Sequence, residues 1–103
     1  MATATVDIGT LIVRTPGTLG GRPRIEGTRI GVDHVAVLWS QGYSAEDIVY
    51  TKYDHLTLGQ VYAALAYYHS NKEAIDASIA AEAALYDRLA REHAISEKRP
   101  RPS

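Results

Sequence analysis

Three arginines near the start of the chain have the clearest capacity to bind a charged ligand. Arg22, Arg24 and Arg29 fall within a span of eight residues. A guanidinium group makes bidentate hydrogen bonds to phosphate oxygens, so this cluster could hold the backbone of DNA. A structural role is equally open, because the same arginines could form ion pairs with Glu26, Asp33 or other acidic side chains.

No pattern in the sequence indicates an enzyme. A Gly-rich phosphate loop after a strand, a nucleophile with a base at a recognisable spacing and a pair of carboxylates are all missing. Asp54 and His55 form a candidate dyad, but both residue types are also common in turns. The four histidines are scattered and there is no cysteine, so we expect neither a metal site nor a cofactor.

The composition indicates one small soluble domain. The chain has 103 residues and a net charge of −1, with positive charge near both ends and negative charge in the middle. This distribution argues against a uniformly basic DNA-coating protein but allows a local phosphate-binding patch. A membrane span and a signal peptide are absent, and together with the lack of cysteine this favours a cytoplasmic protein. Residues 1–10 are expected to be a loose N-terminal lead.

Two helix starts in the middle of the chain predict a helix-turn-helix. Ser44 with Asp47, and Thr57 with Gln60, have the spacing of capping boxes. The two starts are thirteen residues apart, which leaves room for about two helical turns and a corner. The second helix would read bases from its first turns, where Gln60 is the suitable side chain and Thr57 stands at the helix start. A helical pair that merely packs is the competing interpretation.

The second of these helices is expected to turn one apolar stripe inward and leave the opposite face outward. The inward stripe is Leu58, Val61, Tyr62, Leu65 and Tyr68. The outward face is Gly59, Gln60, Ala63, Ala64 and Tyr67.

A short β-ribbon should precede the helices. Residues 11–13 form a β-branched run that ends at a Thr-Pro-Gly turn. Glu26-Gly27 predicts a two-residue hairpin turn, in which Ile25 faces Thr28 while Arg24 and Arg29 share the opposite face.

The first helix should follow the ribbon directly. Asp33 is the expected N-cap, and Gly42 is expected to end the helix. Trp39 is the expected centre of a three-helix core. The predicted fold is therefore mainly α: an N-terminal β-ribbon with a three-helix, winged helix-turn-helix core over residues 11–70.

A long C-terminal helix is predicted over residues 71–95, beginning at a capping box of Ser70 and Glu73. Its apolar face is longer than a small core can cover, so we expect it to pack on another protein chain, although folding back on the core is the alternative. A basic, Pro-rich tail over residues 96–103 is expected to be disordered unless bound. The predicted partner-binding residues are Ile75, Ile79, Leu85, Tyr86, Arg88, Leu89, Arg91, Arg99 and Arg101.

Two segments resemble the family known as domain of unknown function 433 (DUF433). They are GTLGGRPRIEGTRIGVDHV at 17–35 and GYSAEDIVYTKYDHLTLGQVYAALAYY at 42–68. Family members typically carry a GG-[RK]-P-x-I-x-GTRI ribbon and a helical pair containing Y-x-x-L-T-L. Two positions depart from the pattern: Leu19 stands where many members have Cys, and Gly59 where members often have Glu.

The resemblance implies a dimeric, homeodomain-like helix-turn-helix protein that is the antitoxin of a type II toxin-antitoxin pair of the VapB sort. Such an antitoxin would neutralise a PIN-like ribonuclease toxin and repress its own operon by binding operator DNA. The alternative, from a different class, is a dimeric adaptor that binds a protein partner and never contacts nucleic acid. The sequence specifies neither the operator nor the toxin, and it does not say whether the long helix makes the dimer or binds the toxin.

Overall fold

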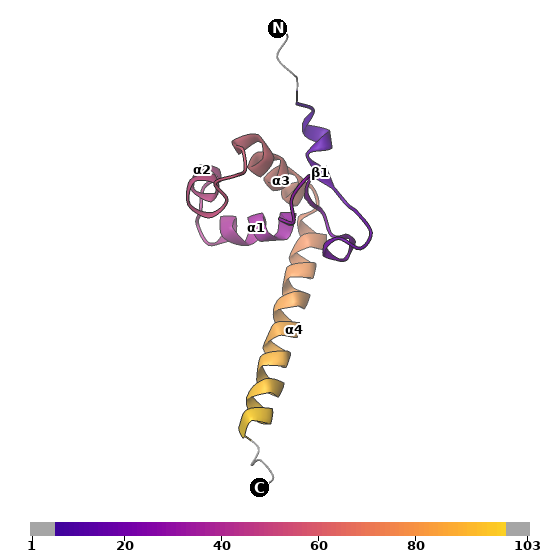
Figure 1. The fold of residues 1–103 in the computed structure, drawn as a ribbon, viewed down its shortest axis with the longest axis vertical. Helices are drawn as coiled ribbons and strands as arrows, with labels where there is room; N and C mark the ends of the chain where they lie inside the picture. The colour runs from indigo at the N-terminus through magenta and orange to yellow at the C-terminus, as the bar shows by residue number, and fades with distance from the viewer. Residues whose placement is uncertain (1–5, 99–103) are drawn as a thin grey trace. The chain divides into compact units, whose positions relative to one another are not determined.

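The computed structural model describes residues 6–98, with side chains placed through Ala94. This part of the chain is mainly helical and includes a two-stranded antiparallel sheet (Figure 1). The elements in order are η1 (Ile8–Thr10), β1 (Ile12–Val13), η2 (Leu19–Gly21), β2 (Arg24–Ile25), α1 (Val32–Ser40), α2 (Ala45–Asp47), η3 (Ile48–Lys52), α3 (Leu58–Ser70) and α4 (Lys72–Lys98). The chain forms two compact units, divided between Lys72 and Glu73, and each is described by itself.

The β-ribbon has a different register from the one that the sequence predicted. β1 pairs with β2, with Ile12 opposite Ile25. The N–H of Ile25 also donates to the carbonyl of Ile30 (2.9 Å), so Ile25 faces Ile30 and not Thr28. The reason is the Thr28 hydroxyl, which donates to the Ile25 carbonyl (2.8 Å) and accepts from the Ile30 N–H (3.0 Å). These two bonds close a loop that is longer than a two-residue hairpin turn.

Helix α1 begins two residues earlier than an Asp33 cap would allow. Gly31 is the N-cap, and its N–H donates to Nδ1 of His34 (2.9 Å). Asp33 lies inside the first turn and is buried, so its prediction as the cap is wrong. Gly42 follows the helix with φ of 99°, which confirms the expected C-terminal stop in left-handed backbone.

The two capping boxes of the helical pair are confirmed. Ser44 Oγ accepts from the Asp47 N–H (3.1 Å), and the Asp47 carboxylate accepts from the Ser44 N–H (3.2 Å). The Thr57 pair is described with the site below. The third predicted box is wrong, because Ser70 is the last residue of α3 and only Asn71 separates that helix from α4.

Helix α3 is the centre of the first unit, since it contacts α1, α2, η3 and both strands (Figure 1). Its buried residues include Ala63 and Ala64, which the sequence placed on the outward face. These small side chains let neighbouring backbone approach closely, so α3 is covered on more sides than its apolar stripe predicted. Tyr62, predicted inward, is 52% exposed.

Trp39 is not the centre of the core. Its side chain is 41% exposed, and its ring contacts His69 edge-on at 4.8 Å and Tyr68 at 6.2 Å. The largest fully buried side chains are instead Ile25, Ile48, Val32, Val35 and Val61. The core is therefore aliphatic, and it joins the ribbon to the three helices.

Helix α4 belongs to the second unit almost entirely. It has 27 residues and a length of about 40 Å. It continues through Lys98, so residues 96–98 of the predicted tail are helical, and residues 99–103 lie outside the described part. Within the described residues, no helix is both long enough and apolar enough to cross a membrane.

Candidate functional site

Arg22 joins the ribbon to the start of α1. Its Nη1–H donates to Asp33 Oδ2 (2.7 Å) and its Nε–H donates to the Leu19 carbonyl (2.9 Å). The Asp33 side chain is 9% exposed and the Arg22 side chain 34%. The other carboxylate oxygen of Asp33 lies so close to Gly31 that a Cβ there would collide with it. The ion pair between Arg22 and Asp33 is one of the structural pairings that the sequence left open.

Arg24 is likewise held by internal contacts. Its two terminal nitrogens donate to the Thr28 carbonyl and to Thr15 Oγ1, both at 2.9 Å. Its Nε is buried and has no hydrogen-bond partner among the described residues. Arg24 therefore ties two loops of the ribbon together.

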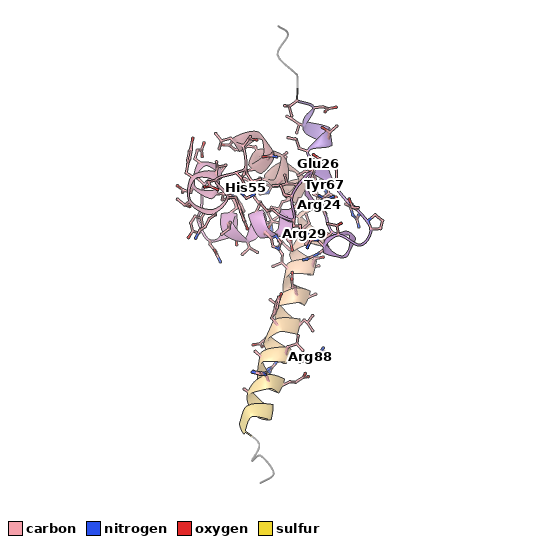
Figure 2. All side chains as sticks on the ribbon, viewed as in Figure 1. Arg24, Glu26, Arg29, His55, Tyr67 and Arg88 are labelled. Atoms are coloured by element: carbon pink, nitrogen blue, oxygen red, sulfur yellow. The ribbon has the colours of Figure 1, made fainter. Side chains whose placement is uncertain are left out.

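Arg29 differs in its contacts from both of these arginines. Figure 2 labels its position and that of Arg24 in the first unit. Its side chain is exposed and makes no ion pair or hydrogen bond to any other residue between 6 and 98. The structure thus separates the arginine cluster into two residues with internal partners and one that is available to a ligand.

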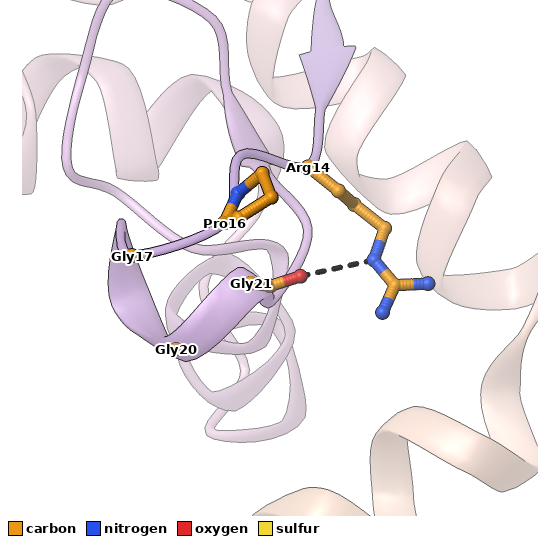
Figure 3. A pocket seen from close by; sticks show the side chains of 5 residues that line it. All are labelled: Arg14, Pro16, Gly17, Gly20 and Gly21. Atoms are coloured by element: carbon orange, nitrogen blue, oxygen red, sulfur yellow. Dashed lines mark hydrogen bonds between the residues drawn. The ribbon is translucent and has the colours of Figure 1, made fainter.

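Arg14 is a further exposed arginine, which the sequence reasoning did not single out. Its Nε–H donates to the carbonyl of Gly21 (3.0 Å) across a hollow in the loop between the two strands (Figure 3). The available signal was its place directly ahead of a segment with several glycines.

The start of α3 carries the other two residues predicted to contact DNA. Thr57 Oγ1 accepts from the Gln60 N–H (3.2 Å), and Gln60 Oε1 accepts from the Thr57 N–H (2.8 Å). This confirms the capping box and commits the Gln60 carbonyl oxygen to it. The Gln60 NH₂ group makes no hydrogen bond in the cap, whereas a bidentate contact with adenine would have to share Oε1 with the Thr57 N–H.

The exposed face shared by α2, η3 and α3 is acidic and aromatic. Tyr62 OH donates to the Glu46 carboxylate (3.1 Å), and this hydrogen bond, followed by the negative charge of Glu46, raises the pKa of Tyr62 above its ordinary value. Tyr50 is 73% exposed. It lies four residues after Glu46 in a continuous helical segment, so the two share a face.

Asp54 and His55 form an exposed pair in the corner before α3. Their side chains are 95% and 61% exposed, and His55 Nδ1 lies 3.9 Å from the Asp54 carboxylate. No cluster of three or more metal-ligating side chains occurs among residues 6–98. The pair therefore lacks the enclosed surroundings in which a dyad becomes reactive.

Helix α4 exposes part of its predicted partner-binding face. Leu85, Tyr86 and Leu89 are 45%, 65% and 47% exposed, whereas Ile75 is buried and Ile79 half-buried. Two further residues of this set, Arg99 and Arg101, lie outside the described residues.

The arginines on α4 pair with acids on the same helix. Arg88 Nε lies 3.8 Å from Glu92 Oε1, and Arg91 Nη2 lies 3.4 Å from Asp87 Oδ2. All four side chains are exposed, so these pairs are weak and open to exchange.

Two comparisons with known proteins identify the family. The family described as Protein of unknown function (DUF433) matches residues 12–68. The chain belongs to the DUF433 family. A crystal structure of a DUF433 member protein from Anabaena variabilis ATCC 29413 is similar, with 38% identity, a TM-score of 0.63 and 68% of each chain covered. Among curated proteins, none matches this chain.

The DUF433 match places the candidate residues in two groups. The ribbon arginines, Thr57 and Gln60 lie inside the matched segment, together with the whole helical pair. Helix α4 begins after the match ends at residue 68. The exposed apolar residues of α4 are therefore features of this chain that the family pattern does not define.

Proposed function

We propose that this DUF433 protein is a cytoplasmic, homodimeric antitoxin of the VapB sort. In this proposal α4 covers a PIN-like ribonuclease toxin, and the first unit binds operator DNA to repress the operon. The observation that carries it is the group of three large apolar side chains exposed on α4, Leu85, Tyr86 and Leu89. Apolar side chains grouped in this way favour a protein interface.

The charges on α4 support the choice of partner. A PIN-like nuclease holds its metal in a ring of carboxylates, which attracts a guanidinium. Arg88 and Arg91 flank Leu89 and are held only by weak pairs on their own helix. Breaking such an exposed pair costs little, and the released guanidinium would donate charge-assisted hydrogen bonds to a carboxylate of the toxin. The basic residues Arg99 and Arg101 would extend the same interaction.

Co-expression with the toxin tests this role. Truncation after Asn71 should abolish neutralisation, and Leu85→Asp with Leu89→Asp should weaken it without unfolding the first unit. Val6→Asp is the matched control, because Val6 is 65% exposed and lies outside α4. A truncated chain that still protects cells from the toxin would contradict the proposal.

For DNA binding we propose that α2 with η3 and α3 act as a homeodomain-like helix-turn-helix, with the β-ribbon beside it as a wing. Arg29 is the free cation of the ribbon cluster, and the Gln60 NH₂ group and Thr57 stand at the start of α3. Arg22 and Arg24 would contribute to the local positive potential while keeping their internal contacts. Two-fold symmetry would make the operator a palindrome with half-sites about one helical turn apart.

The salt dependence of DNA binding tests the wing. Arg29→Glu should weaken binding and reduce the slope of log K against log salt by about 2, since each protomer of the dimer loses one phosphate contact. Arg24→Glu should lower the stability of the fold as well, because its hydrogen bonds to Thr28 and Thr15 are lost. An unchanged slope in Arg29→Glu would remove this residue from the DNA interface.

A dimeric adaptor without nucleic-acid binding is the second candidate, and a specific observation favours it. The outward side of α3 carries Tyr62 bonded to Glu46, an arrangement that repels phosphate. If the protein shows no salt-dependent binding to its own upstream DNA yet still associates with a protein partner, the adaptor function replaces the regulatory one.

A further inference from the structure

The loop between β1 and β2 forms a hollow that none of the functions above uses (Figure 3). It has a volume of about 500 Å³ and is lined by Arg14, Pro16, Gly17, Gly20 and Gly21. A Cβ added at any of these three glycines would meet no atom within 4 Å, so the space beside the loop backbone is open.

Arg14 supplies a fixed cation at this hollow. Its Nε–H donates to the Gly21 carbonyl, which anchors the guanidinium to the loop and leaves both terminal nitrogens without a partner among residues 6–98 (Figure 3). No carboxylate of the described residues pairs with it. A guanidinium anchored in this way offers its remaining N–H groups to an oxyanion at little entropic cost.

The backbone of the same loop offers additional donors. Leu19, Gly20 and Gly21 are consecutive residues at positive φ, of 50°, 64° and 79°, and Gly17 is at 83°. The N–H groups of Gly21 and Arg22 donate to Thr18 and Leu19 carbonyls. Those of Gly17, Leu19 and Gly20 donate to no group in the described part of the chain.

We propose that the loop 14–21 is a binding site for a phosphate group. The Arg14 fork would take two phosphate oxygens, and free backbone N–H groups would take the others. A carboxylate fits less well, because its two oxygens lie in one plane, whereas a phosphate directs additional oxygens toward the backbone N–H groups. The phosphate can belong to inorganic phosphate or a small phosphorylated molecule, or to a nucleic-acid backbone, and the experiment separates these sources.

The test is a ¹H–¹⁵N NMR titration of the full chain with inorganic phosphate at constant ionic strength, with chloride as the reference anion. Saturable shifts are expected at the amides of Gly17, Leu19 and Gly20 and at Arg14 Nε–H. Arg14→Ala should weaken phosphate binding about tenfold, the loss of a charge-assisted hydrogen bond. Lys52→Ala removes a positive charge from an exposed position outside the hollow and should change binding less than about twofold.

Shifts that do not saturate would overturn the site, and so would an equal loss of binding in Arg14→Ala and Lys52→Ala. Arg14→Lys keeps the charge but not the planar fork, and it should lie between the wild type and Arg14→Ala while the loop stays folded. Full binding by Arg14→Lys together with a disordered loop in Arg14→Ala would also contradict the proposal, because Arg14 would then act only through folding.

A second titration with a short DNA duplex identifies the source of the phosphate. Duplex shifts at the same three amides, competed by inorganic phosphate, support the site and assign it a nucleic-acid backbone. Saturable phosphate shifts without duplex shifts support it with a free or small-molecule phosphate. Failure of the phosphate titration removes this inference and leaves the proposed neutralisation by α4 untouched, since none of these residues lies on that helix.

Discussion

The two units of the molecule both place arginine beside a carboxylate, but the pairs differ in what they do. Arg22 and Asp33 meet at 2.7 Å and join the ribbon to α1, with the Asp33 side chain 9% exposed. Arg91 and Asp87 meet at 3.4 Å on one turn of α4, with side chains 71% and 73% exposed. The first pair is part of the fold, whereas the second leaves both charges available to a partner.

Solvation explains the difference. A buried carboxylate that loses its partner keeps a charge in surroundings that cannot solvate it, and this destabilises the folded state. An exposed carboxylate that loses its partner is solvated by water, so little free energy changes. The comparison teaches that the distribution of arginines in the sequence does not reveal which of them a ligand can reach.

The largest expected effect comes from removing one partner of the buried pair. Arg22→Ala should lower the free energy of unfolding by about 2–3 kcal/mol, because Asp33 remains buried without its cation. Arg91→Ala, the matched change in α4, should lower it by less than about 0.5 kcal/mol. Urea unfolding followed by circular dichroism measures both. Equal losses of stability in the two variants would contradict the difference between the buried pair of the first unit and the exposed pair of α4.

The next effect is steric and concerns the same pair. Gly31→Ala should destabilise the first unit by about 1–3 kcal/mol, because the added methyl group displaces the Asp33 carboxylate. Gly59→Ala should instead stabilise it by up to about 1 kcal/mol, since Gly59 lies within α3 and its nearest neighbour, Thr57 Oγ1, is 3.8 Å from the new atom. Thermal unfolding shows whether each substitution lowers or raises the stability of the first unit. A neutral Gly31→Ala variant would mean that Asp33 can move at no cost.

Local side-chain chemistry was predictable from the sequence where it acts within a few residues. The Ser44 and Thr57 capping boxes and the Gly42 stop were all recovered, because each depends on bonds between neighbours in the chain. The same local reasoning wrongly predicted Asp33 as the N-cap of α1. Asp33 looks like a helix cap, but Arg22, eleven residues earlier, competes for its carboxylate and draws it inside the fold. The sequence alone does not say which of two partners an Asp takes.

The buried face of a helix was harder to predict than the position of the helix in the sequence. The periodicity of α3 assigns Tyr62 inward and Ala63 outward, yet the structure reverses both. The spacing of apolar residues predicts one buried face, but it does not indicate how many other elements pack against the helix. Helix α3 has neighbours on several sides, so more than one of its faces is buried. The same limit explains Trp39, whose size suggested a core position that smaller aliphatic residues occupy instead.

A smaller effect should follow from removing a helix cap. Thr57→Ala should cost about 1 kcal/mol of stability, because the N–H of Gln60 loses its acceptor. Ser78→Ala, at an exposed position inside α4, should cost nothing and gain up to about 0.5 kcal/mol from helix propensity. Chemical unfolding of each variant measures the change in the free energy of unfolding. A loss in Ser78→Ala as large as that in Thr57→Ala would show that α4 also depends on side-chain hydrogen bonds.

The smallest expected effect is a titration on the surface of the first unit. The Tyr62 phenol should ionise above its ordinary pKa of 10.0, because its hydrogen bond to Glu46 and the charge of Glu46 favour the neutral form. The contribution of this bond is present below the ordinary pKa and is lost as pH rises through the raised value. Absorbance at the tyrosinate band follows the change, and Tyr62→Phe identifies it. Glu46→Gln should return the pKa toward normal; an unaltered titration in that variant would assign the shift to another cause.

The contact between Asp33 and Gly31 has a consequence for how this sequence can vary. Alanine at position 31 is incompatible with the present position of the Asp33 carboxylate, and loss of that carboxylate removes the ion-pair partner of Arg22. Substitution of any one of these three residues alone should destabilise the fold, and a second substitution among them should restore stability. Across relatives, a substitution at position 22 or 31 should therefore be accompanied by one at position 33, whereas position 29 should vary independently of these three.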